Sequence, residues 1–428
     1  MVIRGGRVID PGDGLDEEAD LFIEDGRIKE IRSRKARRDI SSPPGQTLDA
    51  TGKVVLPGLI DMHVHLREPG REDEETILSG AEAAVAGGFT GVACMPNTEP
   101  PVDDESAVRF ILRRAEGTPV RVYPVAAATK GRRGQELTEI ADLVGAGAVA
   151  VSDDGTPVSD PEIMRRALEY TRMYNIPVVS HCEELSLTAQ GVMNEGRMST
   201  VLGLRGMPPV AEEIMVARDI ALAEYTGGRL HIAHVSTARS VELIRQAKSR
   251  GVNVTTEATP HHFTLTEEAL RSFDTNLKMN PPLRAARDVE AIREGLADGT
   301  IDAIASDHAP HSVEEKEVEF DAAPFGIIGL ETTLALVLTE LVSSGVLSLP
   351  AAVAKLSTNP ALIFGIEGGH LRKGDRADVT VIDPTKRWTV DVTRFRSKSR
   401  NSPFGGRELT GGVEAVIVGG KIVYRCQD

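Results

Sequence analysis

The histidines His63 and His65 are separated by one residue and follow an apolar run that begins at Val54. In a β-strand, side chains two positions apart point to the same face, so both imidazoles would face one side. Imidazole nitrogens close to an acid, Asp61, and a cation, Arg67, suit a divalent metal with an anionic ligand. Two buried, hydrogen-bonded histidines would produce the same short pattern. The spacing by itself therefore leaves a metal site and a structural pair open.

Metal-binding residue types recur at the ends of four further apolar runs. They are Asp153 and Asp154, His181, His234, and Asp307 and His308. Because the chain has only ten histidines, this recurrence is hard to attribute to core packing, and it favours one metal centre assembled from several strands. His231 and His370 are expected to be structural, the second outside the barrel described next. His261 and His262, which follow Pro260, are expected to support ligands instead of binding metal.

The middle of the chain, residues 54–366, repeats one unit: a short β-branched run, a polar loop and a segment with helical periodicity. The eight runs are Val54–Asp61, Phe89–Met95, Val120–Ala126, Gly147–Asp153, Ile176–His181, Arg229–His234, Val252–Ala258 and Ile301–Asp307. Helices are expected at Glu74–Val85 and at Asp160–Tyr174, the latter with Ser159 and Glu162 as a capping box. Eight such units predict an α/β fold, a (β/α)8 barrel, whose catalytic residues lie at the C-terminal ends of the strands.

The two ends of the chain carry short alternating runs divided by glycine turns, such as Asp25–Gly26 and Gly419–Gly420. Asp-Gly between two alternating runs is a strong hairpin signal. Neither end buries much surface by itself. We therefore expect residues 1–53 and 367–428 to form one small β-sandwich-like domain, with the barrel inserted between them.

Composition excludes several classes of protein. The chain has 428 residues, 41% of them hydrophobic, and is long enough for one large and one small globular domain. A net charge of −15 with dispersed acids argues against nucleic acid or an anionic membrane as a partner. Its three cysteines are far apart, no secretory signal begins the chain, and no apolar run approaches about 18 residues. These features predict a cytoplasmic protein without a membrane span.

Several motifs carry a resemblance to a known family. They are Gly58–Gly70, Met95–Thr98, Lys278–Leu283, Ser306–His311, Pro324–Gly326 and Gly329–Thr332. With these motifs the chain resembles the dihydroorotase family of the amidohydrolase superfamily, in its longer bacterial type, over nearly its whole length. The resemblance implies a metal-dependent barrel hydrolase that interconverts dihydroorotate and N-carbamoyl-L-aspartate in pyrimidine biosynthesis.

The resemblance also implies roles for individual residues. The implied metal ligands, for one or two Zn²⁺ ions, are His63, His65, Asp154, His181, His234 and Asp307. The implied substrate-binding residues are Arg67, Asn97, Asn280, His311, Phe325 and Gly326. Asp307 would also be the catalytic acid and base, taking a proton from the attacking water and delivering it to the departing ring nitrogen. Zinc would polarise the carbonyl group and lower the pKa of the water to about 7.

One position departs from much of the superfamily. Hydantoinases, allantoinases and the shorter dihydroorotases have a lysine at the end of the fourth strand, carboxylated to bridge two metals. This chain has Asp153–Asp154 there, as the longer dihydroorotases do. A carboxylate reaches less far than a carboxylated lysine, which leaves the number of metals open.

Two alternatives compete with this interpretation. A hydantoinase- or allantoinase-like hydrolase would share the barrel and four histidines, but Arg67 and Asp154 argue against it. A non-catalytic scaffold for an enzyme such as aspartate carbamoyltransferase would usually have lost metal ligands, and this chain has lost none. We expect a homo-oligomer and retain aspartate carbamoyltransferase as a candidate partner.

Overall fold

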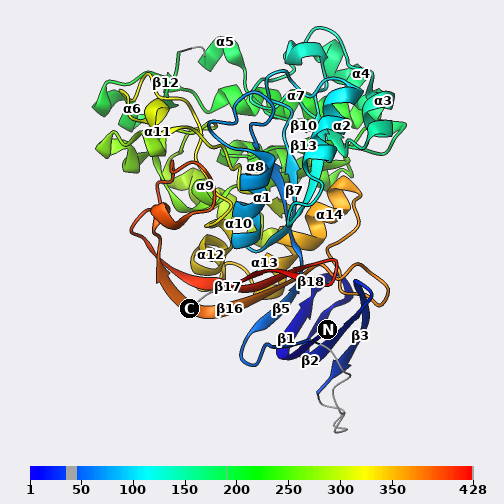
Figure 1. Ribbon diagram of the computed structural model, residues 1–428. Helices are drawn as coiled ribbons and strands as arrows, with labels where there is room; N and C mark the ends of the chain where they lie inside the picture. Colours follow the sequence, from blue (N-terminus) through cyan, green and yellow to red (C-terminus); the bar gives the residue numbers. More distant parts are fainter. Residues whose placement is uncertain (35–45, 189, 427–428) are drawn as a thin grey trace.

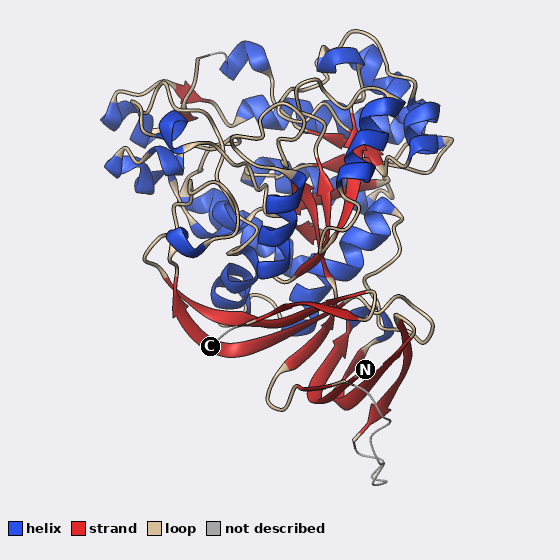
Figure 2. Ribbon diagram, viewed as in Figure 1, coloured by secondary structure: helices blue, strands red, loops and turns tan. Residues whose placement is uncertain are grey.

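A computed structural model of the chain shows a barrel of parallel strands surrounded by helices, with a large β-sheet packed against one side (Figure 1). The structure describes residues 1–34, 46–188 and 190–426. Strands line the interior and helices form the outer layer of the barrel (Figure 2). The predicted α/β barrel is confirmed.

Within the described residues, eight parallel strands form the barrel in sequence order. They are β6 (Leu59–Val64), β7 (Phe89–Cys94), β8 (Arg121–Ala126), β9 (Ala150–Val151), β10 (Val178–Ser180), β13 (Leu230–Ile232), β14 (Val254–Ala258) and β15 (Ala303–Ile304). Nearly every residue in them is buried, as expected of strands covered on both faces. The first and last strands meet where the backbone N–H of His65 donates to the carbonyl oxygen of His308 at 2.8 Å.

The principal outer helices follow the strands in order. They are α1 (Ile77–Ala86), α2 (Glu105–Arg114), α3 (Ile140–Ala146), α4 (Pro161–Arg172), α7 (Val210–Thr226), α8 (Ala238–Ser249) and α10 (Ala286–Asp298). The expected capping box at Ser159 was wrong, because Asp160 caps α4 and accepts from the backbone N–H groups of Glu162 and Ile163. Helix α1 begins at Ile77, after a Thr76 cap, instead of at Glu74.

Shorter elements occupy the loops and the return path. They include α5 (Leu185–Thr188), α6 (Arg197–Leu202), α9 (Pro260–Thr264), α11 (Val313–Lys316), α12 (Thr333–Val337), α13 (Leu349–Val353) and α14 (Asn359–Phe364), with the strand pair β11 (Met193–Asn194) and β12 (Gly206–Met207). Among the described residues, no helix has both the length and the apolar character needed to cross a bilayer.

Both ends of the chain contribute to the second sheet (Figures 1 and 2). Its strands are β1 (Val2–Asp10), β2 (Leu15–Glu24), β3 (Arg27–Ser33), β4 (Thr47–Asp49), β5 (Val54–Pro57), β16 (Val379–Thr389), β17 (Glu408–Val418) and β18 (Lys421–Arg425). The order is β18-β17-β16-β5-β1-β2-β3, with β4 beside β1. Strand β5 is the link, because it pairs with N-terminal β1 on one edge and with C-terminal β16 on the other.

The first barrel strand was placed too early. The run Val54–Asp61 is two strands, since Val54–Pro57 pairs within the terminal sheet and the barrel strand begins at Leu59. Gly58 separates them at a crowded point: a Cβ atom there would lie 2.1 Å from the Thr90 hydroxyl oxygen. The proposed division of the chain into domains at residues 53 and 366 stays a prediction.

Candidate active site

The six residues proposed as metal ligands converge at the C-terminal ends of the barrel strands. Asp154 is central: its Oδ1 lies 3.4 Å from His63 Nε2 and 3.6 Å from His234 Nε2. Its Oδ2 lies 3.6 Å from His65 Nε2, and His181 Nδ1 is 3.9 Å from Oδ1. Two overlapping groups, each with Asp154, place their nitrogen and oxygen atoms close enough to share a metal ion.

Asp307 completes the group from the end of β15. Its Oδ1 lies 3.1 Å from His65 Nε2 and 3.7 Å from His63 Nε2. Burial opposes the charge on Asp307, but the contact with His65 and the nearby histidines outweigh burial and hold the pKa of Asp307 below its ordinary value. Asp307 is therefore a carboxylate next to the histidines.

Three of the histidines are each held from behind by an oxygen acceptor. His63 Nδ1 lies 2.6 Å from Glu257 Oε1, His65 Nδ1 lies 2.7 Å from Asn97 Oδ1, and His181 Nε2 lies 3.0 Å from Glu183 Oε2. An N–H donated to each acceptor leaves the lone pair of the opposite ring nitrogen directed into the cluster. This arrangement orients metal-binding imidazoles and fixes their tautomers.

Two buried atoms in the centre have no hydrogen-bond partner among the described residues: His63 Nε2 and Asp154 Oδ1. Buried polar atoms are nearly always satisfied, so such a facing pair requires an explanation. A cation between them would satisfy both, and imidazole nitrogens with carboxylate oxygens are suitable ligands for a divalent metal. The site fits a metal ion by the chemistry of its donors.

The backbone is strained around this centre. Arg67, His234 and Asp307 have φ values of 59°, 30° and 49°, in the left-handed region that non-glycine residues rarely adopt. Such strain costs of order 1–3 kcal/mol per residue and persists where the surrounding structure imposes it. All three lie just past barrel strands, where the chain turns into the loops that form the rim.

Arg67 lies at this rim in a network of charges. Its Nε is 2.9 Å from Glu74 Oε2, and its Nη2 is 3.4 Å from His311 Nε2. Glu74 also contacts His311 Nδ1 at 3.0 Å and Arg71 at 3.1 Å. His311 Nε2 lies 2.8 Å from the carbonyl oxygen of Phe325. Glu74 therefore holds two of the proposed substrate-binding residues side by side.

The other proposed substrate-binding residues surround the same centre. Asn97 contacts His65, and Asn280 Nδ2 donates to Glu183 Oε2 at 2.8 Å. The Phe325 ring lies under the ammonium of Lys278, 4.8 Å from the ring centroid. Gly326 has φ +136°, and a Cβ atom there would lie 2.9 Å from His311 Nε2. Only glycine fits this approach without displacing the imidazole.

The remaining histidines lie outside the ligand group. His231 contacts Glu257 at 3.2 Å, and His262 contacts the carbonyl oxygen of Pro281 at 2.9 Å. His308 Nδ1 accepts from the backbone N–H of Gly329, which turns its Nε2 towards Glu75. His261 Nε2 is buried without a hydrogen-bond partner among the described residues. His370 lies beside Asp10 in the terminal region.

Several residues that shape the site were not found from the sequence. Glu183 follows His181 by two residues, a spacing that could have indicated a partner for its ring. Glu257 lies inside a buried strand and Glu74 in a loop, where no pattern distinguishes them. Asn401 was assigned to the terminal domain, yet it contacts His311. These residues are recognisable only once the chain is folded.

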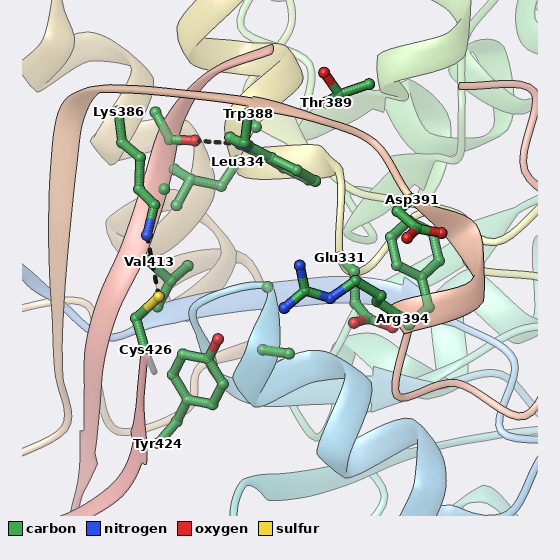
Figure 3. A pocket seen from close by; sticks show the side chains of 16 residues that line it. Glu331, Leu334, Lys386, Trp388, Thr389, Asp391, Arg394, Val413, Tyr424 and Cys426 are labelled. Atoms are coloured by element: carbon green, nitrogen blue, oxygen red, sulfur yellow. Dashed lines mark hydrogen bonds between the residues drawn. The ribbon is translucent and has the colours of Figure 1, made fainter. Parts of the chain in front are cut away.

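A cavity of about 370 Å³ lies between the terminal sheet and the barrel (Figure 3). Trp388, Tyr424 and Leu334 line it, together with Glu331 and Arg394. None of the proposed metal-binding or substrate-binding residues is among its lining residues. The histidine centre is therefore the candidate for catalysis.

Comparison with known proteins gives the family. A family model described as dihydro-orotase-like matches residues 52–240. A dihydroorotase of Pelotomaculum thermopropionicum is 57% identical over 425 residues, covering 99% of this chain and 98% of that protein. A dihydroorotase of Syntrophotalea carbinolica is 55% identical over 429 residues, covering 100% of both. The chain belongs to the dihydroorotase family.

Solved structures place the dihydroorotase fold among related hydrolases. The L-hydantoinase (dihydropyrimidinase) of Arthrobacter aurescens has a TM-score of 0.88 and 28% identity, covering 99% of this chain and 96% of that one. A dihydropyrimidinase of Brevibacillus agri has a TM-score of 0.85 and 25% identity, covering 99% and 95%. The predicted family is confirmed, and the fold is shared with a hydantoinase and a dihydropyrimidinase.

Proposed function

We propose that this chain is a metal-dependent dihydroorotase that interconverts dihydroorotate and N-carbamoyl-L-aspartate in pyrimidine biosynthesis. The observation that carries the proposal is the convergence of four histidines and two aspartates in a chain that is more than half identical to dihydroorotases over its full length. The proposed ligands are His63, His65, Asp154, His181, His234 and Asp307.

We propose zinc as the metal, because the donors are imidazoles and carboxylates. Bound zinc would supply a Lewis acid that polarises the amide carbonyl and lowers the pKa of water to about 7. His63, His65 and His181 are held in place by Glu257, Asn97 and Glu183, so these ligands do not need to reorganise. One or two ions per chain remain compatible with the donor set, because both ligand groups share Asp154.

Asp307 is proposed to move the proton. As a carboxylate it can take a proton from the attacking water and deliver it to the ring nitrogen as the amide bond breaks. In the reverse direction the same carboxylate takes the proton of the attacking nitrogen and donates it to the hydroxyl that leaves as the ring closes. Its position against His65 Nε2 keeps the carboxylate directed into the centre.

Arg67 is proposed to bind the substrate carboxylate. A protein with a net charge of −15 needs a local cation to admit an anionic substrate. The side chain is nearly buried, which strengthens its interaction with a bound anion. Asn97 and His311 are proposed to hold the same carboxylate. Asn280, Phe325 and Gly326 are proposed to line the pocket.

The cytoplasmic location, the homo-oligomer and the association with aspartate carbamoyltransferase stay predictions of the sequence. The primary test is metal analysis of the purified chain combined with a dihydroorotate hydrolysis assay. We expect bound zinc and hydrolysis that a chelator abolishes and added zinc restores. Faster turnover of hydantoin or dihydrouracil than of dihydroorotate would favour the hydantoinase alternative, and a chain that binds metal without turnover would favour a scaffold.

A further inference from the structure

The segment from Phe395 to Phe404 connects β16 to β17, but it leaves the terminal sheet and packs against the active-site loops. Ser399 Oγ donates to the carbonyl oxygen of Glu74 at 2.8 Å. Ser397 Oγ donates to the carboxylate of Glu75. Through these bonds the C-terminal part of the chain reaches the loop that follows Arg67.

The outer end of this segment is anchored at the cavity shown in Figure 3. Glu331, on the cavity wall, accepts from the backbone N–H groups of Arg396 at 2.8 Å and Ser397 at 3.2 Å. The segment is therefore held at its start by Glu331 and further along by Glu74 and Glu75. These contacts fix the position of the segment on the N-terminal side of Asn401.

Asn401 follows these anchored residues within the same segment and has 3% of its surface exposed. Its Oδ1 accepts from the backbone N–H of His311 at 3.3 Å. Its Nδ2 donates to the carbonyl oxygens of Ala309 at 3.0 Å and Gly326 at 3.1 Å. One amide side chain thus bridges the loop after β15 and the loop that contains Gly326, using both its acceptor and its donors.

The bridged loops approach each other closely. A Cβ atom at Gly326 would lie 2.9 Å from both Ala309 Cβ and His311 Nε2, so small changes in their separation matter. His311 in turn contacts Glu74, the acid that pairs with Arg67. A shift of His311 would therefore be transmitted through Glu74 to Arg67, which is proposed to bind substrate.

We propose that Asn401 is a positioning residue of the active site, which sets the separation between His311 and Gly326 and thereby the shape of the substrate pocket. It touches neither the proposed metal ligands nor the reacting atoms in these contacts and acts through backbone groups. The inference rests on the proposed function, because that function assigns His311 and Gly326 to the pocket.

The test compares Asn401→Ala and Asn401→Asp with the wild type. Alanine removes all three bonds. Aspartate has the same shape and keeps the acceptor, but loses the donor and directs a carboxylate at two carbonyl oxygens. We expect both variants to raise KM for dihydroorotate about tenfold, the loss that one or two neutral hydrogen bonds produce, with less change in kcat and no loss of metal. A residue that only fills space would leave Asn401→Asp like the wild type.

Asn359→Ala is the matched control, because Asn359 Nδ2 also donates to a backbone carbonyl oxygen, that of Asp302, before strand β15 begins. It should leave KM unchanged. Amide hydrogen exchange provides a readout independent of activity: peptides that cover 309–311 and 326–328 should exchange faster in both Asn401 variants and not in the control.

The outcomes separate this inference from the proposed function. Wild-type KM and exchange in both Asn401 variants would overturn it, as would an equal rise of KM in Asn359→Ala. If the wild type does not hydrolyse dihydroorotate, the proposed function fails, and faster exchange at both loops alone would still support the positioning role.

Discussion

At the scale of single residues, the centre combines groups that are costly to bury with partners that make burial tolerable. His63 and Glu257 are both buried, and each supplies what the other needs, a donor and an acceptor. Nearby histidines and hydrogen bonds lower the pKa of Glu257 to about 2 against the effect of burial, so it is a carboxylate. The second ring nitrogen of His63, Nε2, takes no part in this pairing and is directed at Asp154.

The proposed ligands should act as a unit, because they converge from the ends of five strands and the loss of one leaves an incomplete centre. We expect His63→Ala and His181→Ala to lose bound metal and hydrolysis while their circular dichroism retains the barrel signature. His370→Ala, in the terminal region, is the control and should keep both. Full activity in metal-depleted His63→Ala would exclude the metal mechanism.

Arg67 allows a test of substrate class. If it binds the carboxylate that dihydroorotate has and dihydrouracil lacks, Arg67→Met should lower kcat/KM for dihydroorotate about 10- to 150-fold. This range corresponds to the roughly 1.5–3 kcal/mol of a hydrogen bond to a charged group. Turnover of dihydrouracil should change little.

The contacts of Arg67 with Glu74 supply the competing explanation, in which Arg67 only stabilises the rim. In that case Arg67→Met would lower kcat/KM for both substrates by the same factor. Arg114→Met is a suitable control, since Arg114 pairs with Glu68 beside Arg67 but faces the outer surface. A parallel fall for both substrates in Arg67→Met would contradict the carboxylate assignment.

At the scale of elements, some barrel strands carry the proposed ligands, and others carry groups that orient those ligands. Strand β14 contributes Glu257, which contacts His63 of β6 as well as His231 of β13. Strand β10 is followed by both His181 and its acceptor Glu183. The proposed metal site therefore depends also on strands that contribute no proposed ligand.

This dependence predicts the effect of Glu257→Gln. The amide keeps one acceptor but removes the charge that holds the Nδ1 proton of His63, so His63 becomes a poorer ligand. We expect metal affinity to fall about 10- to 100-fold, as is usual when the partner of a ligating histidine is altered. Competition with a chelator measures the change.

The exposed Glu169 of α4 provides the control, since Glu169→Gln changes charge by the same amount away from the centre. Equal affinity in wild type and Glu257→Gln would show that Glu257 only packs the core.

At the scale of the whole molecule, partly buried polar contacts join the barrel to the terminal sheet. Arg121 of strand β8 binds Asp378, next to β16, through two bonds, at 2.9 and 3.2 Å. Asp378 also accepts from the backbone N–H of Gly419 in the β17–β18 turn, and its carbonyl oxygen accepts from Gly58. One acid thus joins the barrel, the hairpin and the junction of β5 with β6.

Arg121→Ala should therefore destabilise the whole fold. The nearly buried carboxylate of Asp378 would lose a bidentate partner, and we expect about 1.5–3 kcal/mol of lost unfolding free energy and a lower Tm. Arg109→Ala, which removes an exposed pair with Glu105 on α2, should cost about 0.2–1 kcal/mol. Denaturant titration compares the unfolding free energies of the two variants. Equal losses would show that the Arg121–Asp378 junction stabilises the fold no more than an exposed ion pair does.

The periodic pattern of the sequence was enough to predict the barrel, because eight alternating strand and helix units commonly close into a (β/α)8 barrel. It was also enough to predict that the proposed ligands lie together, because the C-terminal ends of parallel strands meet at one face whatever the loops do. The pattern failed at Val54–Pro57, because an apolar run looks the same whether it enters the barrel or the terminal sheet. Only pairing with β1 and β16 decides between them.

The groups that orient the ligands were decided by tertiary structure. Glu257 is 194 residues from His63, and Glu74 is 237 residues from His311. A lone acid in a strand or a loop carries no local signal of its partner. Asn401 is the extreme case, because its surroundings predict terminal β-structure while its side chain bonds to the active-site loops. The position of a proposed ligand can be predicted from the strand that carries it. The residue that orients the ligand depends on which distant segment the closed barrel places behind it.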